Sequence, residues 1–485
     1  MATPTFLFES AGSSDELYKV VEFQGSEKLN ALYRFQIRLK VDESETVDLH
    51  DLLSNQATLK LEHDQACYQF HGMLESAERE QIAGGYQFFR VVLAPPVWRM
   101  SLGFRSTVYV DKTIPEILDA HLTAAGFSKG ADYDLSGLTA TYPRREFTCQ
   151  YKETDLNFIC RLMEYEGIHF YFENDDNACK LVLADGPDYQ SVPDLDSVTY
   201  SDPGNAKDYE SIVRLTQRYE QVPVSTKVAD YNYMNTSLDV TGTDQITAGG
   251  GYGGDFGSVW MYGENVLSPE EATRIASIRA EEIGCWASVY KGAGAVCDLR
   301  AGFTFKLQGH HYKQHNQSYL VTEITHRARN LDQSWGGRSF EEAERGNDAD
   351  HGRQEAYYSN SFVAISSTVQ FRPRRITAKP KIAGMVTGFV YTDLLDDLRS
   401  VIDDTGRYRV RLPFVAAESD TDQLTCYMRM AQPAAGAKYG AYFLLEPNAE
   451  VQIYFLNGDP DRPVIWGAVY NSASDYLMTN EGVQL

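Results

Sequence analysis

The sequence lacks the features of a membrane-spanning, disulfide-bonded or signal-exported protein. Its first residues, MATPTFLFES, have neither the basic region nor the apolar core of a cleaved signal peptide. No run of about eighteen apolar residues is present, so we expect no stable membrane insertion. The cysteines are odd in number and contain no CxxC pair, which indicates free, buried thiols in a reducing compartment: Cys67, Cys149, Cys160, Cys179, Cys285, Cys297 and Cys426.

Positive charge is also scarce. The chain has 44 Lys and Arg against 68 Asp and Glu, a formal net charge of −24. Such a surface repels phosphate backbones, so nucleic acid is a poor candidate partner.

The common catalytic and nucleotide-binding motifs are missing as well. There is no GxSxG elbow, HExxH helix or P-loop. A loose GxGxxG, from Gly249 to Gly254, has no clear strand before it and no long helix directly after it, so a flexible loop is favoured over a nucleotide site. The run from Asp348 to Gly352 is too short for an EF-hand loop and lacks its terminal glutamate.

Two further clusters admit both a functional and a structural interpretation. His310, His311 and His315 could bind a metal, but they lie among strand-like residues, and a polar strand end or hairpin at a subunit contact is favoured. Asp459 and Asp461 lie in a turn and are better explained by turn chemistry than as a glycosidase pair. We therefore predict no catalytic, cofactor-binding or metal-binding residues and no enzymatic activity.

Alternating apolar and polar residues indicate a chain built mainly of β-strands. Within residues 33–41 every odd position is apolar, so one face packs on a core, while the other, with exposed Arg34, Arg38 and Lys40, is predicted to meet solvent or a partner. Further strands are predicted at residues 57–62 and 86–93, and residues 200–265 are typical of strands and loops.

A few helices are predicted from their capping residues. One begins after Thr154, an N-cap, and ends at Gly167. Another opens with a capping box at Ser268, has proline at its first position and runs to about Gly284. A shorter one covers about 114–125 and is stopped by glycine. The predicted fold class is therefore mainly β with a few helices, a β-rich α+β protein.

A domain boundary is predicted at the basic, proline-marked linker 371–381, which follows a polar surface excursion at about 329–360. Beyond it, short strands indicate a small barrel, most plausibly an OB-fold, at 382–391, 407–414, 424–431, 442–445, 450–456 and 464–470. Residues 381–471 hold eight Lys or Arg against twelve Asp or Glu, which argues against binding of single-stranded nucleic acid.

Several segments resemble the VgrG family of type VI secretion spike proteins. The longest match is the unusual run Gly458-Asp459-Pro460-Asp461-Arg462-Pro463-Val464-Ile465, and another runs from Tyr151-Lys152-Glu153-Thr154-Asp155 to Glu164-Tyr165-Glu166-Gly167-Ile168. Tyr33-Arg34-Phe35, Phe70-His71-Gly72 and Ala301-Gly302-Phe303 also match the family pattern. One departure is Pro447-Asn448-Ala449-Glu450, where the family usually has glycine before Glu-Val.

The resemblance implies a fusion of two phage-tail parts. Residues 1–370 would form a tail-hub-like region with two barrel-like subdomains and helical insertions, residues 382–471 an OB-fold collar, and residues 472–485 the start of a neck or needle. A homotrimer would present a pseudo-sixfold ring to a hexameric tail-tube protein and would contact tail baseplate proteins. Where a β-helix needle is present, it would carry a PAAR-type tip and effectors.

The resemblance also implies a route and an alternative role. The protein would assemble in the bacterial cytoplasm and be injected without a signal peptide, through contraction of a sheath. The chain ends at Leu485, so the needle is expected to be absent from it. The competing hypothesis is an effector-bearing spike with a hydrolytic toxin domain beyond this C-terminus, and the full reading frame would decide between the two.

Overall fold

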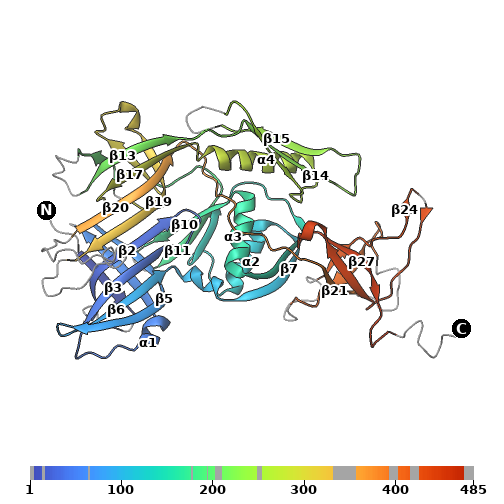
Figure 1. Cartoon of the computed structure of the whole chain (residues 1–485), viewed down its shortest axis with the longest axis horizontal. Coiled ribbons are helices and arrows are strands. Elements are labelled where there is room, and N and C mark those ends of the chain that lie inside the picture. The colour runs from blue at the N-terminus through green and yellow to red at the C-terminus, as the bar shows by residue number, and fades with distance from the viewer. Residues whose placement is uncertain are drawn as a thin grey trace. The chain divides into compact units, whose positions relative to one another are not determined.

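The computed structural model describes residues 5–11, 13, 17–63, 66–175, 178–193, 195–202, 210–247, 254–330, 357–392, 402–415, 425–437 and 439–474. The chain is mainly β, as predicted (Figure 1). Its contacts divide it into two compact units. The first comprises Met1–Arg99, Gly126–Ala140 and Glu164–Arg374, and the second Met100–Ala125, Thr141–Met163 and Arg375–Leu485.

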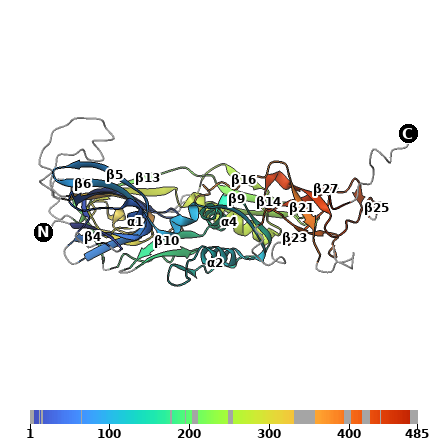
Figure 2. The ribbon, with the colours of Figure 1, turned by 90° about the horizontal axis from the view of Figure 1, so that it is seen from below.

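The first unit contains a closed barrel of six antiparallel strands. They are β1 (Thr5–Ser10), β2 (Lys19–Lys28), β3 (Arg34–Asp42), β4 (Gln56–His63), β5 (Ala66–Ala83) and β6 (Tyr86–Ala94), with the short helix α1 (Leu49–Ser54) between β3 and β4. Neighbouring strands follow the order β1-β4-β5-β6-β3-β2, and the β1–β2 pairing closes the ring. Figure 2 shows β4, β5 and β6 curving around this barrel.

Alternation on β3 correctly predicts which residues form the barrel core. Phe35, Ile37, Leu39 and Val41 are each at most 1% exposed. These side chains fill the interior because successive residues of a strand point to opposite faces.

The polar face of β3 differs from the prediction. Arg34 is exposed, but Arg38 and Lys40 are only 6% and 7% exposed, so the predicted exposure of these two residues is wrong. Arg38 forms an ion pair with Glu80 of β5 at 2.7 Å, and Lys40 lies over the ring of Tyr86 at 4.5 Å. Cross-strand partners on the barrel wall cover these cations, and the pattern of a single strand does not reveal them.

A second ring of six strands follows in the same unit. It consists of β12 (Val198–Tyr200), β13 (Ser211–Tyr219), β17 (Ser288–Gly294), β18 (Thr304–Gln308), β19 (Ser318–Arg329) and β20 (Tyr357–Ser366). The order is β19-β18-β12-β13-β17-β20, and the β19–β20 pairing closes it. The two rings join where β19 pairs with β2, from Glu323 opposite Lys28 to Arg329 opposite Glu22.

Two small sheets complete the first unit. One contains β8 (Tyr133–Gly137), β10 (His169–Asn174) and β11 (Cys179–Ala184). The other contains β14 (Ser225–Asp230), β15 (Val240–Gln245) and β16 (Ser258–Tyr262), and helix α4 (Pro269–Gly284) packs on it. Gly242 of β15 permits this packing, because a Cβ there would lie 2.1 Å from the backbone nitrogen of Thr273.

The second unit combines a two-stranded sheet, most of two helices and an OB barrel. The first part holds β7 (Phe104–Lys112), β9 (Arg145–Thr154), α2 (Ile114–Ala124) and the start of α3 (Asp155–Glu166). The barrel strands are β21 (Met385–Val390), β22 (Tyr408–Arg411), β23 (Thr425–Met428), β26 (Glu450–Phe455) and β27 (Pro463–Val469), in the order β23-β22-β21-β26-β27. A parallel bridge from Met430 to Ile465 closes the barrel.

One predicted strand of the barrel, 442–445, is wrong. The segment contains no strand, and the consecutive residues Phe443 and Leu444 are both exposed. The hydroxyl of Tyr408 holds it instead, donating to the carbonyl of Phe443 and accepting from the N–H of Leu445, each at 3.1 Å. A small hairpin of β24 (Ala435–Gly436) and β25 (Tyr439–Gly440) precedes it.

The predicted helix caps are formed, with one difference. Thr154 accepts a hydrogen bond from Asn157 N–H, and Gly167 has the left-handed φ of 71° that ends α3. Ser268 accepts from Glu271 N–H, but the Glu271 carboxylate accepts from the N–H of Leu267, one residue before the expected partner. The reciprocal half of that capping box is therefore displaced by one residue.

Candidate functional site

The turn that carries the longest family-like motif is the best candidate site in the second unit. It follows β26 through the short 3-10 helix η5 (Leu456–Gly458) and leads into β27. Gly458 adopts a φ of 73°, and Asp459 accepts a hydrogen bond from the N–H of Asp461 at 2.9 Å. Asp459 thus has the turn role that the sequence predicts.

Asp461 does more than complete the turn, because its carboxylate is buried and connects two other segments. It accepts the backbone N–H of Cys149, in β9, at 2.6 Å and forms an ion pair with Lys379 at 2.7 Å. Lys379 also forms an ion pair with Asp459 at 2.5 Å. The side chain of Asp461 is 1% exposed. A lysine of the predicted linker is therefore held by the two carboxylates of the turn.

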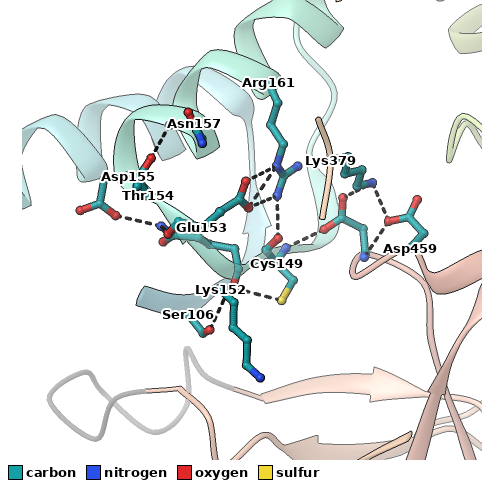
Figure 3. A network of polar contacts seen from close by, with 12 residues as sticks. Ser106, Cys149, Lys152, Glu153, Thr154, Asp155, Asn157, Arg161, Lys379 and Asp459 are labelled. Carbon is teal, nitrogen blue, oxygen red and sulfur yellow. Dashed lines mark hydrogen bonds and ion pairs between the residues drawn. The ribbon is translucent and has the colours of Figure 1, made fainter. Parts of the chain in front are cut away.

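Arg161 of α3 extends this network on the other side of β9. It binds both carboxylate oxygens of Glu153, at 2.8 to 3.1 Å, and donates to the carbonyl of Cys149 at 2.8 Å (Figure 3). Its side chain is 5% exposed and lies over the ring of Phe158. The backbone of Cys149 is thus bound through its N–H by Asp461 and through its carbonyl by Arg161.

The charges of this network stabilise one another. Burial alone would raise the pKa of Asp461, but Lys379 and Arg161 lower it below its ordinary value of 3.8. Burial alone would lower the pKa of Arg161, and Glu153 and Asp461 raise it. Burial raises the pKa of the Cys149 thiol well above 9.0, so the sulfur is protonated and a poor nucleophile. The network is therefore suited to holding segments together and not to nucleophilic catalysis.

A second polar chain lies at the start of α3. Asp155 accepts from Arg105 at 2.6 Å and lies 3.2 Å from Nε2 of His121, whose Nδ1 is 2.5 Å from the hydroxyl of Tyr109. Burial opposes the charged form of Asp155, yet hydrogen bonds from His121, Gln150 and Arg105 lower its pKa to about 2. Burial lowers the pKa of His121, which is 0% exposed, so the imidazole is neutral at pH 7. The sequence identifies Asp155 only as a first-turn residue, because its partners come from β7, β9 and α2.

The three predicted histidines lie together between β18 and β19. His310 and His315 have ring centroids 4.7 Å apart, and His311 pairs with Asp202 at 2.9 Å. His315 ends a single 3-10 turn, η2 (Lys313–His315), so the sequence spacing of His311 and His315 is not that of an α-helix. Within the described ranges, no group of three or more histidine, cysteine or acidic residues is arranged to hold a metal ion.

The other candidates that the sequence suggests fall largely outside the described residues. Of the glycine run only Gly254 is described, and the segment from Asp348 to Gly352 lies outside the described residues altogether. Six cysteines are described as free, of which Cys160 alone is partly exposed. No helix in the described part of the chain is long and apolar enough to cross a membrane.

Two regions of the chain each match a known protein family. A model described as the phage tail baseplate hub (GPD) matches residues 26–332. A model described as the type VI secretion system/phage-baseplate injector OB domain matches residues 398–470. Both families are structural, and neither is an enzymatic domain.

Similar curated proteins are spike proteins and a toxin. The type VI secretion system spike protein VgrG1b of Pseudomonas aeruginosa is 26% identical over 463 residues, which cover 94% of this chain and 59% of that protein. The actin cross-linking toxin VgrG1 of Vibrio cholerae is 26% identical over 489 residues, which cover 98% of this chain and 42% of the toxin. The chain therefore spans about half the length of these two relatives.

Solved structures share the fold. An E. coli component of the type VI secretion system, described as similar to the T4 bacteriophage tail proteins gp27 and gp5, has a TM-score of 0.66 at 20% identity and covers 95% of this chain and 99% of its own. A chain of the half-lidded Francisella PdpA-VgrG complex has a TM-score of 0.62 at 9% identity, covering 98% and 79%. With a hub match over most of its length and an OB domain after it, the chain belongs to the phage tail baseplate hub family and is homologous to the VgrG-type spikes of type VI secretion systems.

Proposed function

We propose that this chain is the hub and collar of a contractile injection spike and that three copies of it form a ring on a hexameric tail tube. The observation that carries the proposal is the pair of six-stranded rings joined through β2 and β19. One chain offers two such barrels, and three chains related by a threefold axis would offer six. Closed cyclic symmetry satisfies each head-to-tail interface without leaving an open end.

Exposed aromatic residues on the OB barrel support self-association at the collar. Trp466 and Tyr470 are 61% and 69% exposed, Phe443 is 63% exposed and Tyr439 is 74% exposed. These four exposed rings all belong to residues 439–470, and exposed apolar surface of this kind commonly marks a contact with another chain. Copies of the collar around a threefold axis would bury these rings.

The proposed role is mechanical. The ring would nucleate the tube in the bacterial cytoplasm, contact baseplate proteins and leave the cell with the tube when a sheath contracts, without a signal peptide. A needle in the full protein would carry a PAAR-type tip and effectors. The buried network around Asp461 suits this role, because each of its charged groups is committed to a fixed contact.

Native mass spectrometry over a dilution series tests the assembly. We expect a mass near three times 54.5 kDa at high concentration, with dissociation on dilution if this chain lacks part of the full interface. Trp466→Ser should shift the monomer–trimer midpoint to higher concentration, whereas Trp466→Phe, which keeps an apolar ring, should shift it less. A strict monomer or a twofold dimer at every concentration would contradict the proposal.

Docking to the tube is a separate measurement. The chain is mixed with preformed hexamers of the tail-tube protein from the same organism, and complexes are imaged by electron microscopy. We expect density for one trimer on one end of a hexamer. A trimer that never associates with tube hexamers would refute the seating proposal while leaving the trimer intact.

The alternative is an effector-bearing spike with a toxin domain beyond the present C-terminus. The name of the V. cholerae relative supports it, since that protein is called an actin cross-linking toxin and this chain matches only 42% of it. The full reading frame separates the two roles. A catalytic domain after residue 485 would favour the toxin.

A further inference from the structure

The three-stranded sheet of the first unit ends in a strand that is open on one side. The order β15-β14-β16 makes β16 an edge, and it pairs with β14 in parallel from Ser225 opposite Ser258 to Ala229 opposite Tyr262. In the part of the chain that the structure describes, no other backbone hydrogen bond involves residues 258–262. Among the described residues, one row of N–H and C=O groups on β16 therefore has no backbone partner.

This edge lacks the usual features that prevent strand addition. Its pairing with β14 has no bulge, and the sequence SVWMY has neither proline nor charge. Soluble proteins normally interrupt an edge strand with lysine, proline or a bulge, because an open, regular edge pairs with other chains. An edge of this kind indicates a strand-binding site.

Aromatic side chains line the open face next to this edge. Trp260 is 69% and Tyr262 64% exposed. Their partners in register are Lys227 and Ala229 of β14, and the ammonium of Lys227 lies 5.6 Å from the Trp260 ring centre. Helix α4 packs on β14 and β15. An added strand beside β16 would place alternate side chains against the two rings.

The segment that contains this sheet is rich in acidic residues, which favours a basic partner. Residues 220–267 contain one lysine, Lys227, and six acidic residues: Glu220, Asp230, Asp239, Asp244, Asp255 and Glu264. An acidic or phosphate-bearing partner would be repelled, whereas lysine or arginine side chains on an extended segment would be attracted and could stack on Trp260.

We propose that the β16 edge is a docking site for a basic, extended segment of a partner protein, which adds as a fourth strand and places its apolar and cationic side chains on Trp260 and Tyr262. Main-chain hydrogen bonds would supply sequence-tolerant affinity, and the aromatic row and negative field would supply selectivity. The second copy of this chain is the competing occupant of the same edge.

Hydrogen exchange of the full chain with designed peptides tests the site. The probes are an acetylated, amidated peptide of alternating lysine and valine, eight residues long, and its glutamate–valine analogue. We expect the basic peptide to slow exchange of residues 258–262, and its affinity to fall at least tenfold between low and moderate salt. The acidic peptide should not protect these residues.

Variants make the test specific. Trp260→Ser combined with Tyr262→Ser should weaken binding of the basic peptide at least tenfold. Tyr312→Ser, at an equally exposed tyrosine (66%) elsewhere in the same unit, should leave the affinity for this peptide unchanged. Unchanged exchange of β13 and β17 in the double variant would show that the unit is folded. The proposal is overturned if both peptides bind equally well, or if the basic peptide binds the double variant as tightly as the unchanged chain. It is also overturned if residues 258–262 are fully protected without peptide, because another copy of the chain would then already cover the edge.

Discussion

Replacing Asp461 by alanine should loosen the second unit selectively. The carboxylate is buried, accepts Cys149 N–H at 2.6 Å and pairs with Lys379 at 2.7 Å. Alanine removes an anion from a buried pair and leaves Lys379 with Asp459 alone. Such truncation typically costs about 3–5 kcal/mol, because the remaining donors are left without their acceptor.

The Cys149 thiol supplies a direct assay for this loss. It is 0% exposed, so a thiol reagent reaches it only when the unit opens. If opening is in rapid equilibrium, a loss of about 3–5 kcal/mol raises the labelling rate by roughly a hundred- to several-thousand-fold. Labelling is read at Cys149 by mass spectrometry, with Cys285 of the first unit, also buried, as the internal control that should not change.

Two variants and pH sharpen the test. Asp459→Asn should have a smaller effect, since the side chain of Asp459 is 15% exposed against 1% for Asp461. Because the folded pKa of Asp461 lies below its ordinary 3.8, its contribution is fully present above about pH 4 and is lost as the pH falls below this. In Asp461→Asn, the free energy of unfolding of the unit should therefore depend less on pH in that acidic range. A Cys149 labelling rate unchanged in Asp461→Ala would refute this account of the network.

Two further predictions concern the first unit. Arg38→Ala should destabilise the first barrel by about 3–5 kcal/mol, because it leaves the buried carboxylate of Glu22, a residue 5% exposed, without a nearby cation. Adding Glu22→Gln removes this buried negative charge and should recover part of the lost stability. Denaturant unfolding, followed by hydrogen exchange of β3, measures both effects, and no recovery in the double variant contradicts this explanation. Gly242→Ala should cost about 3 kcal/mol and speed exchange in β15, since its Cβ would meet the α4 backbone at Thr273; unchanged exchange would mean that the helix can move away.

The sequence predicts which side chains of a strand face the core, but it does not predict which partners the polar side chains contact. Alternation on residues 33–41 places Phe35 and Ile37 inside the barrel, as found. The same alternation assigns Arg38 to a face exposed to solvent or a partner, whereas Glu80, 42 residues away, binds and buries it. A period-two pattern reports one strand, and the cross-strand partner depends on register between distant segments.

The candidate site was partly predictable for the same reason. The turn at Asp459 follows from local Gly-Asp-Pro chemistry. The contact of Asp461 with Cys149 joins residues that are 312 positions apart, and neither local sequence predicts it. The motif resemblance includes Asp461 but begins at Tyr151, two residues after Cys149, so the contact between them comes only from the fold.

The basic linker is a further example, since its cations have specific partners. Arg372 donates to Glu281 at 2.6 Å and to the carbonyl of Gly167 at 2.9 Å in the first unit. Lys379 binds the two carboxylates of the turn in the second unit. Composition alone predicts a basic linker at a domain boundary, and the structure adds that these two residues are held by ion pairs.

The packing of the OB barrel leads to a prediction about its independence. Its core includes residues from β7 and β9, among them Val108, Phe147 and Cys149, which are at most 7% exposed. A fragment of residues 382–471 lacks these side chains and also lacks Lys379, so its barrel would expose apolar surface and leave the Asp461 carboxylate without either partner.

We therefore expect the 382–471 fragment to bind a hydrophobic dye and to unfold without a sharp transition. A fragment of residues 375–474 mixed with residues 100–163 should bind less dye and unfold cooperatively, because the cation and the missing core side chains are restored. The matched control is the same mixture with Phe147→Ala, which should restore less. Cooperative unfolding of 382–471 alone, at the midpoint that its strands show in the full chain, would mean that the barrel is complete by itself and that the strands before it contribute no stability.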